Sequence, residues 1–137
     1  MPRFMLDTNT ISYALRGSPP AVREHLRQVP MVQVCISCIT EAELLLGLAL
    51  NPEAKRLAEL VNQFLLGVAS LPWDSITARA YAELGSASWK QGKPPLAAMD
   101  MLVAAHALSL GLTLVTSDRS FRHLRPRLQL ADWSLPE

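Results

Sequence analysis

Short apolar runs alternate along the chain with longer segments that carry apolar residues at helical spacing. A continuous apolar run of about four to eight residues, bounded by turn residues, is typical of a buried strand. Five such runs predict strands: "RFML" (3–6), "MVQVCIS" (31–37), "VASLPW" (68–73), "LTLV" (112–115) and "LQLADW" (128–133). We expect the third and the last of these to be short.

The segments between these runs predict helices. In one of them, apolar residues recur at i, i+3, i+4, i+7 and i+8, which gives one apolar face: Leu57, Leu60, Val61, Phe64 and Leu65. Asn51-Pro52 is typical of a helix start, and Thr40-x-x-Glu43 has the spacing of a capping box. The expected helices cover 8–16, 21–28, from Thr40 onward, 51–67, 75–91 and 97–109, with a loop at "QGKPP".

Apolar strands separated by helices indicate an α/β fold, with a central parallel sheet of about four or five strands and helices on both faces. With 137 residues, 50% of them hydrophobic and 18% charged, the chain suits one domain spanning 1–137. In open sheets of this class, ligands bind beyond the carboxyl ends of the strands. We therefore expect the functional side chains to lie where the strands end.

Charge and hydropathy bear on whether the chain binds nucleic acid or a membrane. A formal net charge of +1 means that binding to nucleic acid would depend on local patches. The apolar stretches, such as "LLLGLAL", are too short to span a bilayer. A basic segment followed by a long apolar one is missing at the N-terminus, so we expect no signal peptide, no membrane association and a cytoplasmic location.

Two cysteines, Cys35 and Cys38, have the Cys-x-x-Cys spacing of a redox pair or of half a zinc site. No second cysteine pair or His-x-x-x-His sequence completes a zinc site. Cys35 also lies within an apolar run, which favours a buried structural residue.

Four acidic residues fall where the predicted sheet presents its ligand-binding edge. Asp7 follows the first strand, and Asp118 follows "LTLV" after Thr116 and Ser117. Glu43 lies in the helix that begins after "VQVCIS", and Asp100 lies in the first turn of an apolar helix. Four separate segments would thus bring carboxylates to one place.

Each acid also has a local interpretation. Asp7 could cap a helix, Glu43 could belong to the capping box, Asp100 could face a helix dipole and Asp118 could begin a turn. Taken together, these interpretations are weaker, because Asp100 has mainly apolar neighbours and a lone buried carboxylate is costly. We therefore expect Thr8 and Asn9 to do the turn and capping work beside Asp7.

Gathered carboxylates repel one another and need a compensating charge. Mg²⁺ prefers oxygen ligands and keeps several waters, whereas zinc would call for His or Cys, which these junctions lack. An acidic Mg²⁺ site is typical of phosphate chemistry, in which the ion activates water and stabilises charge on phosphate oxygens.

At these residues the chain resembles PIN-domain ribonucleases, specifically the VapC-type toxins of bacterial type II toxin–antitoxin pairs. The similar segments run in order along the sequence: "MLDTNTISYALRG", "ISCITEAELLLG", "MDMLVAAHALSLG", "LVTSDRSF" and the terminal "DWS". The resemblance implies an endoribonuclease with a metal and catalytic site of Asp7, Glu43, Asp100 and Asp118. It further implies Mg²⁺ or Mn²⁺ as cofactor, Asn9 and Thr116 as residues that orient the site, and cleavage of RNA by metal-activated water.

The resemblance also implies partners. The substrate is expected to be RNA, with transfer RNA favoured, and an antitoxin protein is expected to neutralise the toxin and to bridge a larger assembly to operator DNA. Toxins of this family usually form homodimers. A local basic patch after Asp118 is a candidate RNA-binding surface: Arg119, Arg122 and Arg125, with Arg127 beyond them and Arg16, Arg23 and Arg27 as a second cluster.

Two alternatives stay open. A Mg²⁺-dependent phosphatase with an aspartyl nucleophile usually carries Asp-x-Asp after the first strand, and here the sequence is Asp7-Thr8-Asn9. A member of the same family could also act mainly within a DNA-bound toxin–antitoxin complex, with little nuclease activity. Of the two candidate general bases, His106 is expected to be structural, while His123 could contact substrate.

Overall fold

The computed structural model describes residues 1–92 and 96–136 of the chain. Its five strands form a single sheet, in the order β3-β2-β1-β4-β5, and every neighbouring pair is parallel. The strands are β1 (Phe4–Leu6), β2 (Val34–Ser37), β3 (Ala69–Leu71), β4 (Thr113–Val115) and β5 (Leu130–Ala131). The predicted parallel α/β sheet is confirmed, with the first strand at its centre.

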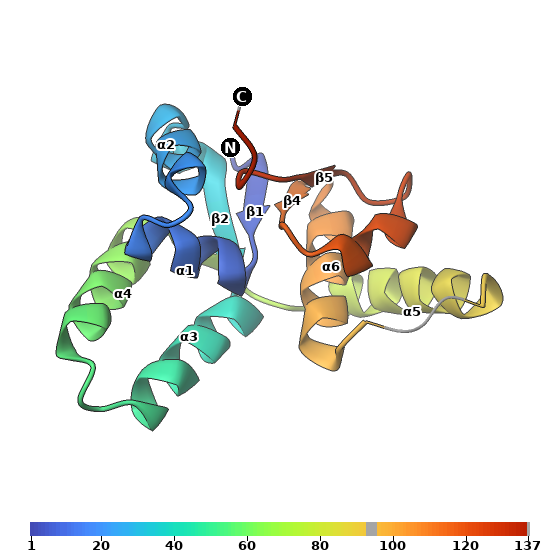
Figure 1. Ribbon diagram of the computed structural model, residues 1–137. Helices are drawn as coiled ribbons and strands as arrows, with labels where there is room; N and C mark the ends of the chain where they lie inside the picture. The colour runs from blue at the N-terminus through green and yellow to red at the C-terminus, as the bar shows by residue number, and fades with distance from the viewer. Residues whose placement is uncertain (93–95, 137) are drawn as a thin grey trace.

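Helices cover both faces of this sheet (Figure 1). They are α1 (Thr8–Arg16), α2 (Pro20–Gln28), α3 (Cys38–Leu50), α4 (Lys55–Gly67), α5 (Ser75–Lys90) and α6 (Ala98–Leu110), with short 3₁₀ helices η1 (Met31–Gln33) and η2 (Arg119–Leu124). Successive strand residues point to opposite faces, so Met5 packs with α5 and α6, while Leu6 packs with α1, α3 and α4. No helix of the described residues is long and apolar enough to cross a membrane.

Two predicted helix starts were wrong because the side chains of Ser37 and Asn51 bond to the backbone elsewhere. Helix α3 begins at Cys38, where the Ser37 hydroxyl accepts a hydrogen bond from the Ile39 N–H at 3.1 Å. Thr40 therefore lies inside the helix, and no capping box forms. Asn51 ends α3 by donating to the Gly47 carbonyl at 3.0 Å, so α4 starts only at Lys55.

The remaining differences are small. Residues 31–33 form η1 and shorten the predicted second strand, and β5 spans two residues of the predicted "LQLADW". Part of the predicted loop "QGKPP" falls on residues 93–95, which lie outside the described residues.

The winding of the sheet changes direction between β1 and β4. From β1 the chain moves outward to β2 and β3, then returns across the sheet to β4 and β5. A doubly wound sheet binds its ligands where the direction of winding changes. Asp7 directly follows β1, and Thr116 directly follows β4, so both lie where the winding changes.

Candidate active site

Asp7 lies at the end of the central strand and is 7% exposed. Its backbone N–H donates to the Val115 carbonyl at 3.1 Å, and its Oδ1 accepts from the Thr10 N–H at 2.8 Å. Asp7 is therefore the N-cap of α1, and the expectation that Thr8 and Asn9 would do this work was wrong. Burial raises the pKa of the Asp7 carboxyl above its usual value, and hydrogen bonds from Thr10 and Thr116 oppose that rise.

Thr116 joins Asp7 to Asp118. Its side chain hydrogen-bonds to the Asp7 carboxylate, and its Oγ1 accepts from the Asp118 N–H at 3.1 Å. Asp118 in turn is the N-cap of η2, and its Oδ1 accepts from the Ser120 N–H at 2.9 Å and the Ser120 hydroxyl at 2.8 Å. A buried threonine thus fixes the backbone between two of the acids.

Glu43 reaches the site from α3. Its Oε1 accepts a hydrogen bond of 2.7 Å from the Thr8 hydroxyl, which lies 35 residues away in sequence. Asn9, the predicted orienting residue, is exposed at the start of α1, and its side chain makes no hydrogen bond to another described residue. Thr8 therefore contacts an acid that Asn9 does not.

Asp100 comes from the opposite face of the sheet, in the first turn of α6. Burial raises the pKa of its carboxyl, and the negative charges of Glu43, Asp118 and Asp7 raise it further, in that order. The four acids are therefore close enough to interact as charges. Between residues that the structure describes, no ion pair neutralises any of them.

This donor set fits a hard divalent cation. All four side chains offer carboxylate oxygens, the ligands that Mg²⁺ and Mn²⁺ favour, and the excess negative charge is uncompensated. Within 1–92 and 96–136, no three His, Cys, Asp or Glu side chains are gathered as a ready cage for an ion. A loose acidic cluster still suits Mg²⁺, because this ion keeps several waters and needs only one or two protein carboxylates.

A cavity of about 630 Å³, here called the acid-site cavity, opens beside Asp100 and Asp118. Arg119 and Arg122 of η2 also line it. Arg125 lies just beyond η2 and is exposed. Two guanidinium groups thus stand at the same opening as two of the carboxylates, so a phosphate could meet positive charge there as well as a bound cation.

Three of the other predicted basic residues have partners in the fold, and Arg16 lines a pocket beside Thr8 and Glu43. Arg127 pairs with Glu83 at 3.6 Å, and Arg27 pairs with Glu24 at 3.9 Å. Arg23 donates from Nε to the Ala14 carbonyl at 2.9 Å and from a terminal nitrogen to the Leu15 carbonyl at 2.8 Å, which satisfies the end of α1. Arg23 therefore serves the fold.

The two histidines considered as general bases, His106 and His123, lie in different surroundings. His106 is buried, bonds through Nδ1 to the Ser37 hydroxyl at 2.8 Å, and has a pKa lowered by burial, which fits a structural role. His123 lines the acid-site cavity. Its Nδ1–H donates to the Ser120 carbonyl, so its Nε2 accepts from the Ser88 hydroxyl, each at 2.8 Å. Both ring nitrogens are thus engaged, one within η2 and the other in joining η2 to α5.

Neither cysteine forms a disulfide, and burial raises the pKa of the Cys35 thiol to about 11, which makes that residue unreactive.

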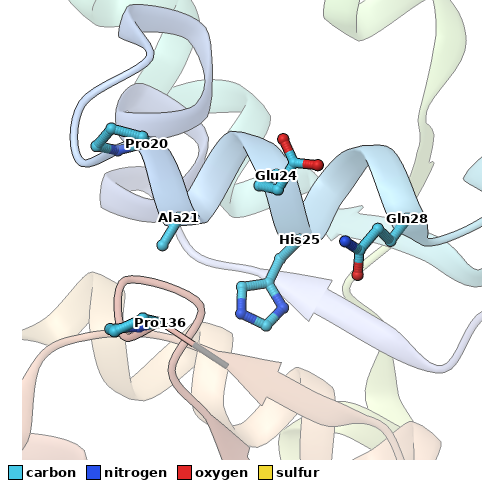
Figure 2. Close-up of a pocket in the computed structure, with 6 residues that line it drawn as sticks. All are labelled: Pro20, Ala21, Glu24, His25, Gln28 and Pro136. Carbon is cyan, nitrogen blue, oxygen red and sulfur yellow. The ribbon is translucent and has the colours of Figure 1, made fainter.

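A separate pocket between α2 and the C-terminal segment contains none of the four acids (Figure 2). Its lining includes Pro20, Glu24 and Pro136, and we assign no chemistry to it.

Sequence reasoning missed two threonines beside the acids. Thr8 holds Glu43, and the Thr10 hydroxyl donates to the Val115 carbonyl at 3.1 Å, which ties α1 to the end of β4. Both follow Asp7 directly in "DTNT", so the signal was present as a run of small polar residues after a strand. Their partners, however, are 35 and 105 residues away.

Comparison with known proteins gives one family. The PIN domain model matches residues 4–125. A tRNA(fMet)-specific endonuclease VapC of Shigella flexneri is 30% identical over 135 residues, covering 98% of this chain and 100% of the relative. Toxin FitB of Neisseria gonorrhoeae is 38% identical over 121 residues, covering 83% of this chain and 86% of the relative.

Solved structures of VapBC complexes contain chains of the same fold. DNA-bound VapBC from Salmonella typhimurium superposes with a TM-score of 0.86 at 30% identity, covering 97% of this chain and 99% of that one. VapBC2 from Rickettsia felis, bound to a DNA fragment from its promoter, has a TM-score of 0.83 at 26% identity, covering 95% and 98%.

Proposed function

The chain belongs to the PIN-domain family and, within it, to the VapC toxins of toxin–antitoxin pairs, and on that premise we propose that it is a metal-dependent endoribonuclease. The observation that carries the proposal is a cavity where Asp100 and Asp118 meet Arg119 and Arg122. Glu43 and Asp7 lie close enough for their charges to raise the pKa of Asp100 as well. Relatives named as ribonucleases and endonucleases support the same reaction. We propose that residues 1–137 form a single PIN domain.

The four acids differ in how the fold holds their carboxylates. Asp7 and Asp118 are fixed by their own helix caps and by Thr116, so they present carboxylates of defined orientation. Glu43 is oriented by the Thr8 hydroxyl, and Asp100 enters from the opposite face. We assign all four to a site for Mg²⁺, or Mn²⁺, and the strongest assignments are Asp7 and Asp100.

A bound divalent cation would lower the pKa of a water molecule and offset charge on the phosphate oxygens. The protein's own part is to position the substrate. Arg119 and Arg122 face the acid-site cavity and can bind the RNA backbone. Without the cation, the carboxylates would repel the phosphate.

The test is an RNA cleavage assay on the purified chain, with Mg²⁺ and with EDTA. Cleavage in Mg²⁺ and its loss in EDTA are expected. Asp100→Asn should reduce the rate by at least about 100-fold. Glu59→Gln is the matched control, because Glu59 is an exposed carboxylate on α4 that pairs with Arg56. Equal rates for Asp100→Asn and the wild type would overturn the assignment.

Transfer RNA is the proposed substrate, since two relatives are named as tRNA(fMet)-specific endonucleases. Sequencing of RNA ends after brief expression in cells would locate the cleavage site. Discrete ends within transfer RNA support this choice, whereas ends scattered over all RNA classes contradict it.

A cognate antitoxin is the proposed partner, and relatives are known as toxin–antitoxin complexes, some of them bound to DNA. An apolar groove between α1, α3 and α4 starts at Thr8 and Glu43 and supports this proposal; Leu15, Leu44, Leu48 and Leu57 line it. A segment of the antitoxin bound in this groove could reach the acids with a basic side chain.

We further propose a homodimer, since α3 also exposes Leu45, Leu46 and Leu50.

Complexes of relatives on promoter DNA also support the second candidate function, a regulatory complex with little nuclease activity. The same cleavage assay separates the two. A chain that is folded and binds Mg²⁺ but does not cut RNA would favour the regulatory function.

A further inference from the structure

A second cavity lies next to the acid-site cavity, on the other side of η2. It has a volume of about 330 Å³ and is here called the β5 cavity. Its lining combines polar residues after β4, two arginines, one further carboxylate and an apolar floor: Thr116, Ser117, Asp118, Arg122, Arg125, Leu130, Ala131, Asp132 and Leu135. It is large enough for one small ligand.

The two cavities share a wall. Asp118 and Arg122 line both of them, so a chain that passes over these two residues would enter one cavity from the other. Arg122 and Arg125 make no ion pair with another described residue, which leaves both guanidinium groups available to phosphate. Successive phosphates of an RNA strand could thus be held on either side of η2.

Asp132 gives the β5 cavity a feature that phosphate binding does not require. It follows β5 directly, at the same sheet edge as Asp7. Its Oδ1 accepts hydrogen bonds from both the N–H and the hydroxyl of Ser134, which fixes the carboxylate. A carboxylate has about four acceptor positions, so Oδ2 can still accept from a ligand. An anion would be repelled by this group, whereas an amino group would be attracted.

We propose that the β5 cavity binds one nucleotide next to the scissile phosphate, with Arg122 and Arg125 on its phosphates and Asp132 selecting a base that carries an amino group. This inference rests on the proposed ribonuclease function. Leu130 and Leu135 supply the apolar surface against which a base can lie. Adenine, cytosine and guanine present an amino group to a carboxylate, and uracil does not.

The test uses Asp132→Asn, since asparagine keeps the acceptor for Ser134 and replaces the second oxygen with a donor. The wild type and the variant are given a pool of short single-stranded RNAs with randomised positions around a cleavable site. We expect the wild type to disfavour uracil at one position beside the cut by about tenfold, and the variant to lose that preference. Glu59→Gln, outside both cavities, should keep it.

Binding is measured separately, so that failure of the cavity and failure of the nuclease can be told apart. Fluorescein-labelled hexaribonucleotides are titrated into the Asp100→Asn protein in Mg²⁺, with and without Asp132→Asn, because Asp100→Asn should slow cleavage by at least about 100-fold. A base preference in binding that disappears with Asp132→Asn supports the β5 cavity even if no RNA is cut. RNA cleavage with an unchanged preference in Asp132→Asn overturns the cavity proposal and leaves the nuclease intact.

Arg125→Gln keeps the proposal testable if Asp132→Asn does not fold, because Arg125 is exposed. This variant should weaken hexanucleotide binding and lower its salt dependence by about one phosphate contact. Unchanged binding would count against the cavity. Thermal melting of each variant identifies loss of fold.

Discussion

Replacing Asp7 with asparagine should make the protein more stable while it abolishes RNA cleavage. Asparagine caps a helix about as well as aspartate, so the hydrogen bond from the Thr10 N–H can remain. The change removes a negative charge from a side chain that is only 7% exposed. Burial disfavours that charge and raises the pKa of the Asp7 carboxyl in the folded chain.

The size of the gain follows from the linkage between pKa and stability. Each pKa unit between the folded and unfolded states is worth about 1.4 kcal/mol. We expect Asp7→Asn to be more stable than the wild type at pH 7 without divalent cations, and each kcal/mol gained should raise Tm by about 3 to 5 °C for a chain of this size. Asp7→Ala removes the cap as well and should be about 1 kcal/mol less stable than Asp7→Asn.

The gain should depend on pH in a defined direction. Because the folded pKa of Asp7 is raised, the folded state holds its proton more tightly than the unfolded state does. Stability therefore falls as the pH rises from the unfolded value of 3.8 through the folded pKa. The advantage of Asp7→Asn should be present at pH 7 and should disappear near pH 3, where both states of the wild type are protonated.

Divalent cations should reverse the order of stability. A ligand that binds only the folded state at 100 times its Kd stabilises it by about 2.7 kcal/mol. The wild type should thus gain more from Mg²⁺ than Asp7→Asn does, and should overtake it at saturation. The assay is thermal unfolding at pH 3 and pH 7, in EDTA and across a Mg²⁺ titration. An equal Tm for the two proteins in EDTA at pH 7, or an equal response to Mg²⁺, would refute the reasoning.

Three further predictions follow from contacts around the site and in α3. Thr116→Val removes a hydrogen bond that lowers the pKa of Asp7, so kcat should fall by about tenfold and the acidic limb of the pH–rate profile should move upward; a fall without that shift contradicts the role. Thr40→Val removes a buried hydroxyl that lacks a hydrogen-bond partner, so urea unfolding should show a gain of about 1 kcal/mol, and a loss would contradict it. Arg122→Gln should weaken RNA binding and reduce its salt dependence, as measured by fluorescence anisotropy, whereas Arg127→Gln, which loses only the pair with Glu83, should change little.

The sheet could be predicted from the sequence because parallel strands are buried on both faces. Val34, Cys35, Ile36 and Ser37 are all buried, so their run of apolar letters is continuous and easy to recognise. Their parallel order then placed the strand ends at one edge. This rule places Asp7 and Asp118 at the same edge, and the structure brings them close because β1 and β4 are neighbours.

Contacts between distant segments could not be predicted in the same way. Helix α3 starts at Cys38, with Ser37 in place of Thr40 as its N-cap, and the Ser37 hydroxyl is also bonded to His106, 69 residues away. The same holds for Thr8, whose partner Glu43 comes from another helix. The local pattern favoured a capping box at Thr40, and contacts with distant residues placed the cap at Ser37.

The local and the chemical interpretations of the acids are therefore compatible. Asp7 and Asp118 are both helix caps, and each accepts backbone hydrogen bonds through one oxygen, Oδ1. Those bonds leave acceptor positions on the carboxylate while they fix its direction. A ligand that must meet several charges at once benefits from groups already held in place. The caps are thus the means by which this fold would hold two carboxylates ready for a cation, and a capping motif at the end of a buried parallel strand does not argue against a site.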